Sequence, residues 1–158
     1  MDTNGKSLIF RVGLVELALA DRDVGSILPD PKVMPVPEMG SGVTGLLAVG
    51  GEPRYVLDLR VKFGVEASTR RPVAIVLRRY PVVLVVDTVL DLVRIEGAEV
   101  RRVPKRPSEY RKYVAGVWRG RSRPCFLLDL VAILPEELLV TQSPSGDLSV
   151  RRSVPRLQ

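Results

Sequence analysis

Short apolar runs separated by glycine, proline and polar residues recur along this chain, and such runs predict β-strands. Residues 8–20 contain two such runs joined at Gly13, and they predict a first hairpin. Residues 46–59 contain two more, separated by Gly50 and Gly51, and they predict a second hairpin. The first part of the chain therefore has the pattern of a β protein.

Proline and aspartate indicate the local structure around these strands. The short apolar run 24–28 is followed by four prolines between residues 29 and 37, so we expect an extended surface segment and no helix there. Asp58 is predicted to cap a short helical turn that runs to Phe63 and stops at Gly64.

The strands of the second half are apolar on both faces. Residues 73–77 and 82–86 carry almost no polar side chain, so both faces need cover, and open edges of this kind would aggregate. The pattern favours a closed barrel or an intimate pair of barrels. Further strands are predicted at 89–95, 113–118 and 124–130.

Two stretches of the sequence parallel each other. Residues 45–59 and residues 115–130 both run from a strand through a glycine turn to a closing Leu-Asp-Leu. We therefore predict an all-β fold of two β-barrels related by a pseudo-repeat and joined by short helical turns. The first barrel is expected mainly in 8–70 and the second mainly in 73–134.

The C-terminal residues carry a different pattern. Residues 131–139 predict a short C-terminal helix, with Pro135 better suited to a helix start than to its middle. Ser, Pro, Gly and Arg dominate residues 141–158, which are expected to form a flexible tail.

Composition agrees with one β domain held together by its own core. Of the 158 residues, 46% are hydrophobic and 5% aromatic, with valine and leucine dominant, a bias that favours strands. The single cysteine, Cys125, cannot form an internal disulfide and is predicted to be buried. The N-terminus lacks the pattern of a signal peptide, and no apolar run approaches the ~20 residues of a transmembrane helix. We expect a cytoplasmic protein without direct membrane insertion.

The chain contains no histidine, which removes the usual general base, the commonest zinc ligand and the phosphodonor of a histidine kinase. Asp58 and Asp129 match in the two halves and could be imagined as an acid–base pair, but helix capping explains both. Asp87 follows an apolar strand as a phospho-accepting aspartate would, yet no acidic pair for magnesium precedes it, so we assign it to turn amides. No enzymatic activity, metal site or cofactor is expected.

The net charge of +6 is concentrated in one segment. Residues 101–123 hold nine basic residues and one acid, a net of +8, with Tyr110, Tyr113 and Trp118 interleaved. Basic and aromatic side chains together are typical of nucleic-acid surfaces, so a nucleic-acid-associated β-barrel is the alternative function. Tyr113 and Trp118 fall on apolar strand positions, which favours a basic loop facing a protein instead. The candidate basic surface is Arg101, Arg102, Lys105 and Arg106.

The order and spacing of these pieces, over residues 8–139 as a single domain, resemble the CheW-like family. The matching pieces are Phe10, Val24-Gly25-Ser26-Ile27, Pro35-Val36-Pro37, Gly45 through Val56-Leu57-Asp58-Leu59, Val85-Val86-Asp87-Thr88-Val89, Tyr113-Val114-Ala115-Gly116 and Leu127-Leu128-Asp129-Leu130. The resemblance implies two SH3-like five-stranded barrels and a non-catalytic adaptor. A groove between the barrels would take the tip of a chemoreceptor's helical hairpin, and barrel faces would contact the regulatory domain of a CheA-type histidine kinase, with other CheW-like proteins as further candidate partners.

Residue roles follow from the resemblance alone. It places the receptor-binding positions at Val24, Ser26, Ile27 and Gly50, with Val89 and Val93 lining the groove. The family commonly has an acid where Ser26 stands and an arginine where Gly50 stands. Loss of both leaves no unpaired charge, whereas loss of one from a buried pair would be costly. We therefore expect a divergent member of the family with altered partner choice.

Overall fold

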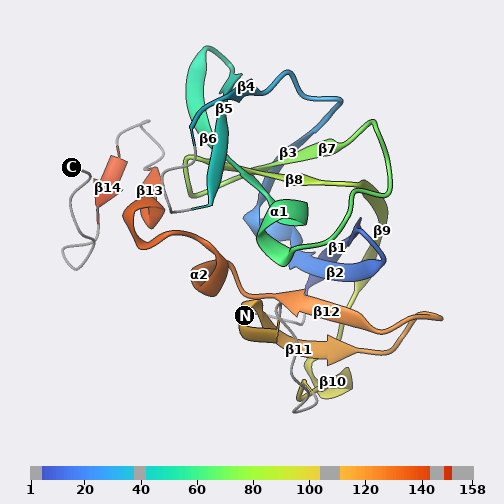
Figure 1. The fold of residues 1–158 in the computed structure, drawn as a ribbon. Coiled ribbons are helices and arrows are strands. Elements are labelled where there is room, and N and C mark those ends of the chain that lie inside the picture. The colour runs from blue at the N-terminus through green and yellow to red at the C-terminus, as the bar shows by residue number, and fades with distance from the viewer. Residues whose placement is uncertain (1–4, 38–41, 104–110, 143–147, 151–158) are drawn as a thin grey trace.

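Most of the described chain is β-strand, arranged in two six-stranded sheets that pack against each other (Figure 1). The computed structural model describes residues 5–37, 42–103, 111–142 and 148–150. Sheet A contains, in spatial order, β10 (Val100–Arg101), β11 (Val114–Trp118), β12 (Cys125–Leu128), β2 (Val15–Ala20), β1 (Lys6–Val12) and β9 (Thr88–Arg94). Sheet B contains β3 (Val24–Pro29), β7 (Val73–Leu77), β8 (Val82–Val86), β6 (Glu52–Asp58), β5 (Val43–Val49) and β4 (Met34–Pro35).

Both sheets curl into barrels, because a short connection joins their opposite edges. The edges of a flat six-stranded sheet would stand about 24 Å apart. The chain from the end of β3 to the start of β4 spans at most about 18 Å, and the chain from β9 to β10 at most about 22 Å. The predicted all-β class with two barrels is confirmed. Each sheet has six strands, not five, because a two-residue strand lies at one edge.

Strand pairing divides the chain differently from the predicted halves. The first hairpin, β1–β2, joins sheet A with β9 to β12, whereas the later hairpin, β7–β8, joins sheet B with β3 to β6. The expected barrels at 8–70 and 73–134 are therefore wrong in their boundaries. Sequence neighbours pair within each hairpin, but each hairpin completes the barrel built by the other half of the chain.

The two barrels nevertheless repeat each other closely. In each, an antiparallel edge strand pairs with the hairpin, and the hairpin pairs in parallel with the strand before a helical turn. Bulges recur at matching places in the two barrels. One pair lies between Val24 and Ser26 on β3 and between Val89 and Asp91 on β9, and the other lies just before Gly45 and just before Gly116. This register makes β3 the counterpart of β9, and residues 43–57 the counterpart of 114–128.

Glycine is required at one hairpin turn and at one position in each of two corresponding strands. Gly50 and Gly51 have φ of 59° and 83°, the left-handed backbone that a tight hairpin turn needs, as predicted for the second hairpin. Gly45 and Gly116 permit a close approach instead, since a Cβ would lie 2.7 Å from the Met34 carbonyl oxygen or from the Val100 side chain, respectively. In each barrel, the strand that contains this glycine therefore passes close to the short edge strand beside it: β5 to β4 and β11 to β10.

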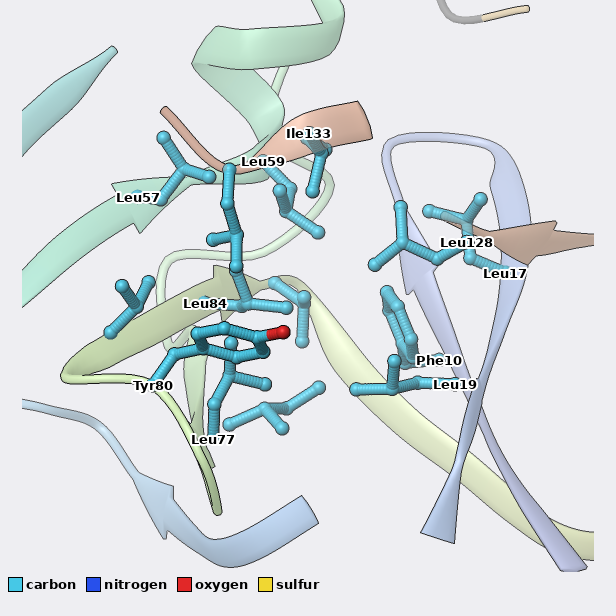
Figure 2. Packing of buried hydrophobic residues seen from close by; sticks show 14 of the residues in the cluster. Phe10, Leu17, Leu19, Leu57, Leu59, Leu77, Tyr80, Leu84, Leu128 and Ile133 are labelled. Atoms are coloured by element: carbon cyan, nitrogen blue, oxygen red, sulfur yellow. The ribbon is translucent and has the colours of Figure 1, made fainter. Parts of the chain in front are cut away.

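The largest hydrophobic cluster lies between the two sheets. It joins side chains from sheet A with side chains from sheet B, and ten of its members are labelled in Figure 2: Phe10, Leu17, Leu19, Leu57, Leu59, Leu77, Tyr80, Leu84, Leu128 and Ile133. The barrel interiors are smaller clusters around Trp118 and Cys125 in sheet A and around Val56 and Val83 in sheet B. The sequence predicted that both faces of strands 73–77 and 82–86 are buried. One face packs into the barrel interior and the other packs against the opposite sheet.

Short helical turns connect the strands. They are α1 (Leu59–Phe63), α2 (Leu130–Ile133) and the 3₁₀ turns η1 (Asp21–Asp23), η2 (Gly97–Glu99), η3 (Arg111–Tyr113) and η4 (Glu136–Leu138). The single helix expected at 131–139 is instead two turns, since Pro135 cannot continue α2 and stands at the start of η4.

The segment expected to be a flexible tail contains two paired strands. β13 (Val140–Gln142) and β14 (Leu148–Val150) are antiparallel, and the other residues of 143–158 lie outside the described residues. The described part of the chain includes no helix long and apolar enough to cross a membrane.

Replacing Leu84 with alanine tests whether the barrels share one core. Leu84 belongs to sheet B and is fully buried in the inter-sheet cluster, so we expect a loss of about 2–5 kcal/mol in the free energy of unfolding. The single tryptophan, Trp118, belongs to sheet A, and its fluorescence should report the same loss as circular dichroism during denaturation. Leu14→Ala, at a side chain that is 77% exposed, is the control and should change stability by no more than about 0.5 kcal/mol. Separate transitions for the two probes would contradict a shared core.

Candidate partner-binding surfaces

A cavity of about 240 Å³ opens at one end of the interface between the two barrels. Its lining comes from the turns next to β3 and β8 on one side and from β11, β12 and α2 on the other. The lining residues are Arg22, Asp23, Arg79, Tyr80, Ala115, Leu128, Asp129, Leu130 and Val131. Apolar and charged groups of both signs meet there, which suits a protein segment better than a small charged molecule.

Hydrogen bonds to the start of β3 hold one wall of this cavity. The Arg78 guanidinium donates to the carbonyl oxygens of Arg22 at 3.0 Å and Val24 at 2.8 Å. Arg79 forms an ion pair with Asp23 at 3.3 Å. The turn before β8 is thereby tied to the turn before β3.

The predicted receptor-binding residues fall into separate groups. Val24, Ser26 and Ile27 lie on β3, an edge strand of sheet B, where Val24 is buried next to the cavity and the other two are exposed. Gly50 is exposed in the β5–β6 turn of the same sheet. Neither β5 nor β6 pairs directly with β3.

Val89 and Val93, expected to line the groove, lie on β9 at the edge of sheet A. Both are half-buried; Val89 packs against the inter-sheet cluster and Val93 against the interior of sheet A. Neither lines the cavity. They therefore belong to the opposite sheet from the β3 group.

The structure describes only part of the basic segment 101–123. Arg101 ends β10, where its Nη1 donates to the carbonyl oxygen of Ala98 at 2.7 Å, and exposed Arg102 follows. Lys105 and Arg106 lie outside the described residues. The two aromatic residues described in this segment pack inward: Trp118 is 6% exposed, and Tyr113 stacks on Phe63 with ring centroids 5.9 Å apart. Base stacking by these two rings would require them to leave the core.

Asp87 accepts hydrogen bonds from turns of both barrels. It is 1% exposed, and its carboxylate accepts from the backbone N–H of Gly13, from that of Ser68 at 3.1 Å and from Arg60 at 3.3 Å. The expected role in satisfying turn amides is confirmed. Arg60 also pairs with Asp58 at 2.9 Å, and the hydrogen bond to Asp58, followed by those to Asp87, raises the pKa of the guanidinium.

Asp58 and Asp129 act as helix caps, as the sequence predicts. Asp58 accepts from the Arg60 N–H at 2.9 Å, and Asp129 from the Ala132 N–H at 3.2 Å. They begin α1 and α2, which follow corresponding strands of the two sheets. Among the residues that the structure describes, no three acidic or cysteine side chains gather in a way that could hold a metal ion.

A charge cluster in sheet A was not found by sequence reasoning. Arg121 pairs with Glu16 at 3.3 Å and with Asp91 at 3.1 Å, while Arg11 lies 3.8 Å from the other oxygen of Glu16. Glu16 is 5% exposed, so these partners compensate a buried charge. Sequence reasoning could not find these pairs, because the two acids lie 30 and 105 positions from Arg121.

Taken together, the geometry defines two SH3-like β-barrels with a cleft between them and edge strands on both sheets. A family model described as the CheW-like domain matches residues 6–138. The chain therefore belongs to the CheW-like domain family, whose members are non-catalytic scaffold and adaptor proteins. Among solved structures, the chain is similar to the scaffolding protein TtCheW from Thermoanaerobacter tengcongensis, with 18% identity, a TM-score of 0.66, and coverage of 79% of this chain and 88% of that one. The comparison with curated proteins finds no match.

Cys125 provides a test of the buried cluster in sheet A. Burial, reinforced by the Glu16 carboxylate, raises the pKa of its thiol to about 12 from an ordinary value near 9. Because the unfolded thiol ionises first, its contribution to stability is complete below pH 9 and is lost as the pH rises toward 12. We expect the stability of the protein relative to its Cys125→Ala variant to fall by up to about 1.4 kcal/mol per pH unit in that window, measured by denaturant unfolding at pH 8 and 10.5. An unchanged difference between the two proteins would contradict the buried neutral thiol.

Proposed function

We propose that this protein is a coupling adaptor of a bacterial chemosensory array, which acts in the cytoplasm and links a chemoreceptor to a CheA-type histidine kinase. The observation that carries the proposal is the paired-barrel fold with a mixed apolar and charged cavity between the barrels, in a member of the CheW-like family. An adaptor of this kind needs two binding surfaces and no chemistry. The signal it passes is limited by its differential affinity for the two kinase states, typically ~1–3 kcal/mol of coupling.

The receptor-side surface in this proposal comprises the exposed part of β3 and the adjoining cavity. Ile27 is 40% exposed and Ser26 is exposed beside it, on a strand whose outer edge has no partner among the described strands. Such an edge offers backbone hydrogen bonds and an apolar side chain together. Gly50 extends the surface at the β5–β6 turn, and Val89 and Val93 belong to a separate contact on β9.

Internal repetition supports the idea that an acid and an arginine at positions 26 and 50 would pair. The register of the repeat makes Asp91 the counterpart of Ser26, and Arg121 the counterpart of Gly50. Asp91 and Arg121 form an ion pair at 3.1 Å in sheet A. Sheet B would carry the equivalent pair in the relatives that have both residues, so its loss here is one coordinated change.

Restoring that pair is expected to change partner choice. The variant Ser26→Glu/Gly50→Arg should bind a chemoreceptor signalling fragment at least about fivefold more tightly, because an interface residue that matters is worth more than about 1 kcal/mol. A Cβ at position 50 meets no atom within 4 Å, although its φ of 59° costs about 1–3 kcal/mol of stability for a residue with a side chain. Ser26→Gln/Gly50→Gln carries the same size and strain without charge and serves as the control. Equal receptor affinity in the two variants and the wild type would count against the proposed surface.

Co-purification tests the function as a whole. We expect the protein to retain both a chemoreceptor signalling domain and a kinase regulatory domain from the same genome at moderate salt. Reversing charge at Arg101, Arg102, Lys105 and Arg106 to glutamate should leave receptor binding intact while abolishing any binding to DNA. Retention of the receptor alone would indicate an adaptor that tunes array composition. Binding to neither domain, with retained affinity for DNA, would overturn the coupling role in favour of a nucleic-acid surface.

A further inference from the structure

Two lysines that belong to different barrels converge on one aromatic ring. The Lys62 Nζ lies 5.3 Å from the centroid of the Tyr113 ring, and the Lys112 Nζ lies 5.2 Å from the same centroid. Lys62 is part of α1, which follows β6 of sheet B, whereas Lys112 is part of η3, which precedes β11 of sheet A. We call Lys62, Tyr113 and Lys112 the two-lysine patch.

Aromatic stacking explains why these lysines meet. Each lysine directly precedes an aromatic residue, Phe63 or Tyr113, and the two rings stack with their planes 2° apart. The Lys62 side chain also passes close to the backbone of Gly42, where an added Cβ would lie 3.4 Å from the Lys62 Nζ. Packing between the two barrels therefore determines where these cations lie, although they are far apart in the sequence.

The positive charges of the patch are not neutralised within the part of the chain that the structure describes. Neither Lys62 nor Lys112 forms an ion pair there, and the Asp58 and Asp87 carboxylates beside α1 are bonded to Arg60 instead. The Tyr113 ring attracts both cations but carries no net charge. Because both lie near one ring, the ammonium groups are no farther apart than about 10 Å, the distance over which 0.1 M salt screens charge. They therefore repel each other, and an anion that contacts both would relieve the repulsion.

The surroundings of the patch favour a protein segment over a nucleic acid. Tyr113 stacks on Phe63 and packs against the inter-sheet cluster, so its ring is not an open platform for a base. Val61, next to Lys62 in α1, is 56% exposed and offers an apolar contact of the kind found in protein interfaces. Two cations also make a small site compared with the roughly 6–10 phosphate contacts of a DNA-binding surface.

From this geometry we infer that the two-lysine patch binds an acidic helical segment of a protein partner, with one carboxylate at each lysine. Acidic residues three or four positions apart on a helix have Cβ atoms about 5–6 Å apart, so their side chains can reach both ammonium groups. Such a like-charged pair destabilises its own helix, and the two lysines compensate it. The patch lies outside both β3 and the lining of the inter-barrel cavity, so an acidic partner there does not depend on the coupling role.

Titration of the full chain with two synthetic peptides, followed by nuclear magnetic resonance, tests this site. Both peptides are alanine-based helices of about 20 residues with two glutamates, which stand four positions apart in one peptide and two positions apart in the other. The four-spaced peptide should shift the amide signals of Lys62 and Lys112 and bind about tenfold more tightly than the two-spaced peptide at low salt. Equal affinities for the two peptides, or shifts confined to other residues, would overturn the inference.

Removing both lysines should abolish the preference for the four-spaced peptide. We expect Lys62→Gln/Lys112→Gln to weaken its binding about tenfold, to the affinity of the two-spaced peptide. The control Lys6→Gln/Lys32→Gln removes the same amount of charge at two exposed side chains and should change the affinity by less than about twofold. Because Lys62 is half-buried, the variant Lys112→Gln provides a second test at an exposed side chain and should weaken binding about threefold. Equal losses in the patch variant and the control would reduce the effect to net charge and contradict the site.

Two further ligands distinguish an acidic protein segment from other anions. Inorganic phosphate at matched ionic strength should not displace the four-spaced peptide, and any binding of duplex DNA should be the same in Lys62→Gln/Lys112→Gln as in Lys6→Gln/Lys32→Gln. Displacement by phosphate would indicate a general anion site, and a selective loss of DNA binding in the patch variant would indicate a nucleic-acid surface; either result would overturn the inference. No receptor or kinase is present in these measurements, so failure of the coupling role would leave their outcome unchanged.

Discussion

The rest of the structure depends on the apolar contact between the two sheets. Each barrel encloses only a small interior cluster, whereas the cluster between the barrels draws large side chains from both, including Phe10 and Leu17 from sheet A and Leu77 and Leu84 from sheet B. A barrel separated from its partner would expose that whole face to water, at a cost of about 25 cal/mol for each Å² of apolar surface. The relative placement of the two barrels is thus part of the fold.

The strand topology also makes each barrel depend on the other half of the chain. Because β1–β2 completes the barrel formed by the second half of the chain, and β7–β8 completes the barrel formed by the first, neither half can close a barrel alone. The chain crosses between the two sheets at Arg22, which lies between β2 and β3, and at Asp87, which lies between β8 and β9. The cavity and the cluster of Asp58, Arg60 and Asp87 lie at these two junctions, so these polar features of the interface are located where the chain crosses it.

A repeated architecture lets two equivalent positions take different roles. The acid–arginine pair of Asp91 and Arg121 occurs in sheet A, whereas the equivalent positions in sheet B hold Ser26 and Gly50. Arg60 bonds to Asp58 and Asp87 at one end of the interface, whereas its counterpart Val131 lines the cavity at the other end. Substitution at such positions leaves the apolar register that builds the barrels unchanged.

The sequence by itself determined the local elements of this protein. Alternating apolar residues, the Gly50-Gly51 turn and the capping aspartates Asp58 and Asp129 act within a few residues of themselves, and the structure confirms each of them. Only the tertiary structure decided which hairpin completes which barrel, that Val24 and Val89 belong to different sheets, and that Arg121 forms an ion pair with Glu16. Those outcomes depend on pairing between strands dozens of residues apart, and the apolar period within a strand does not specify which distant strand it pairs with.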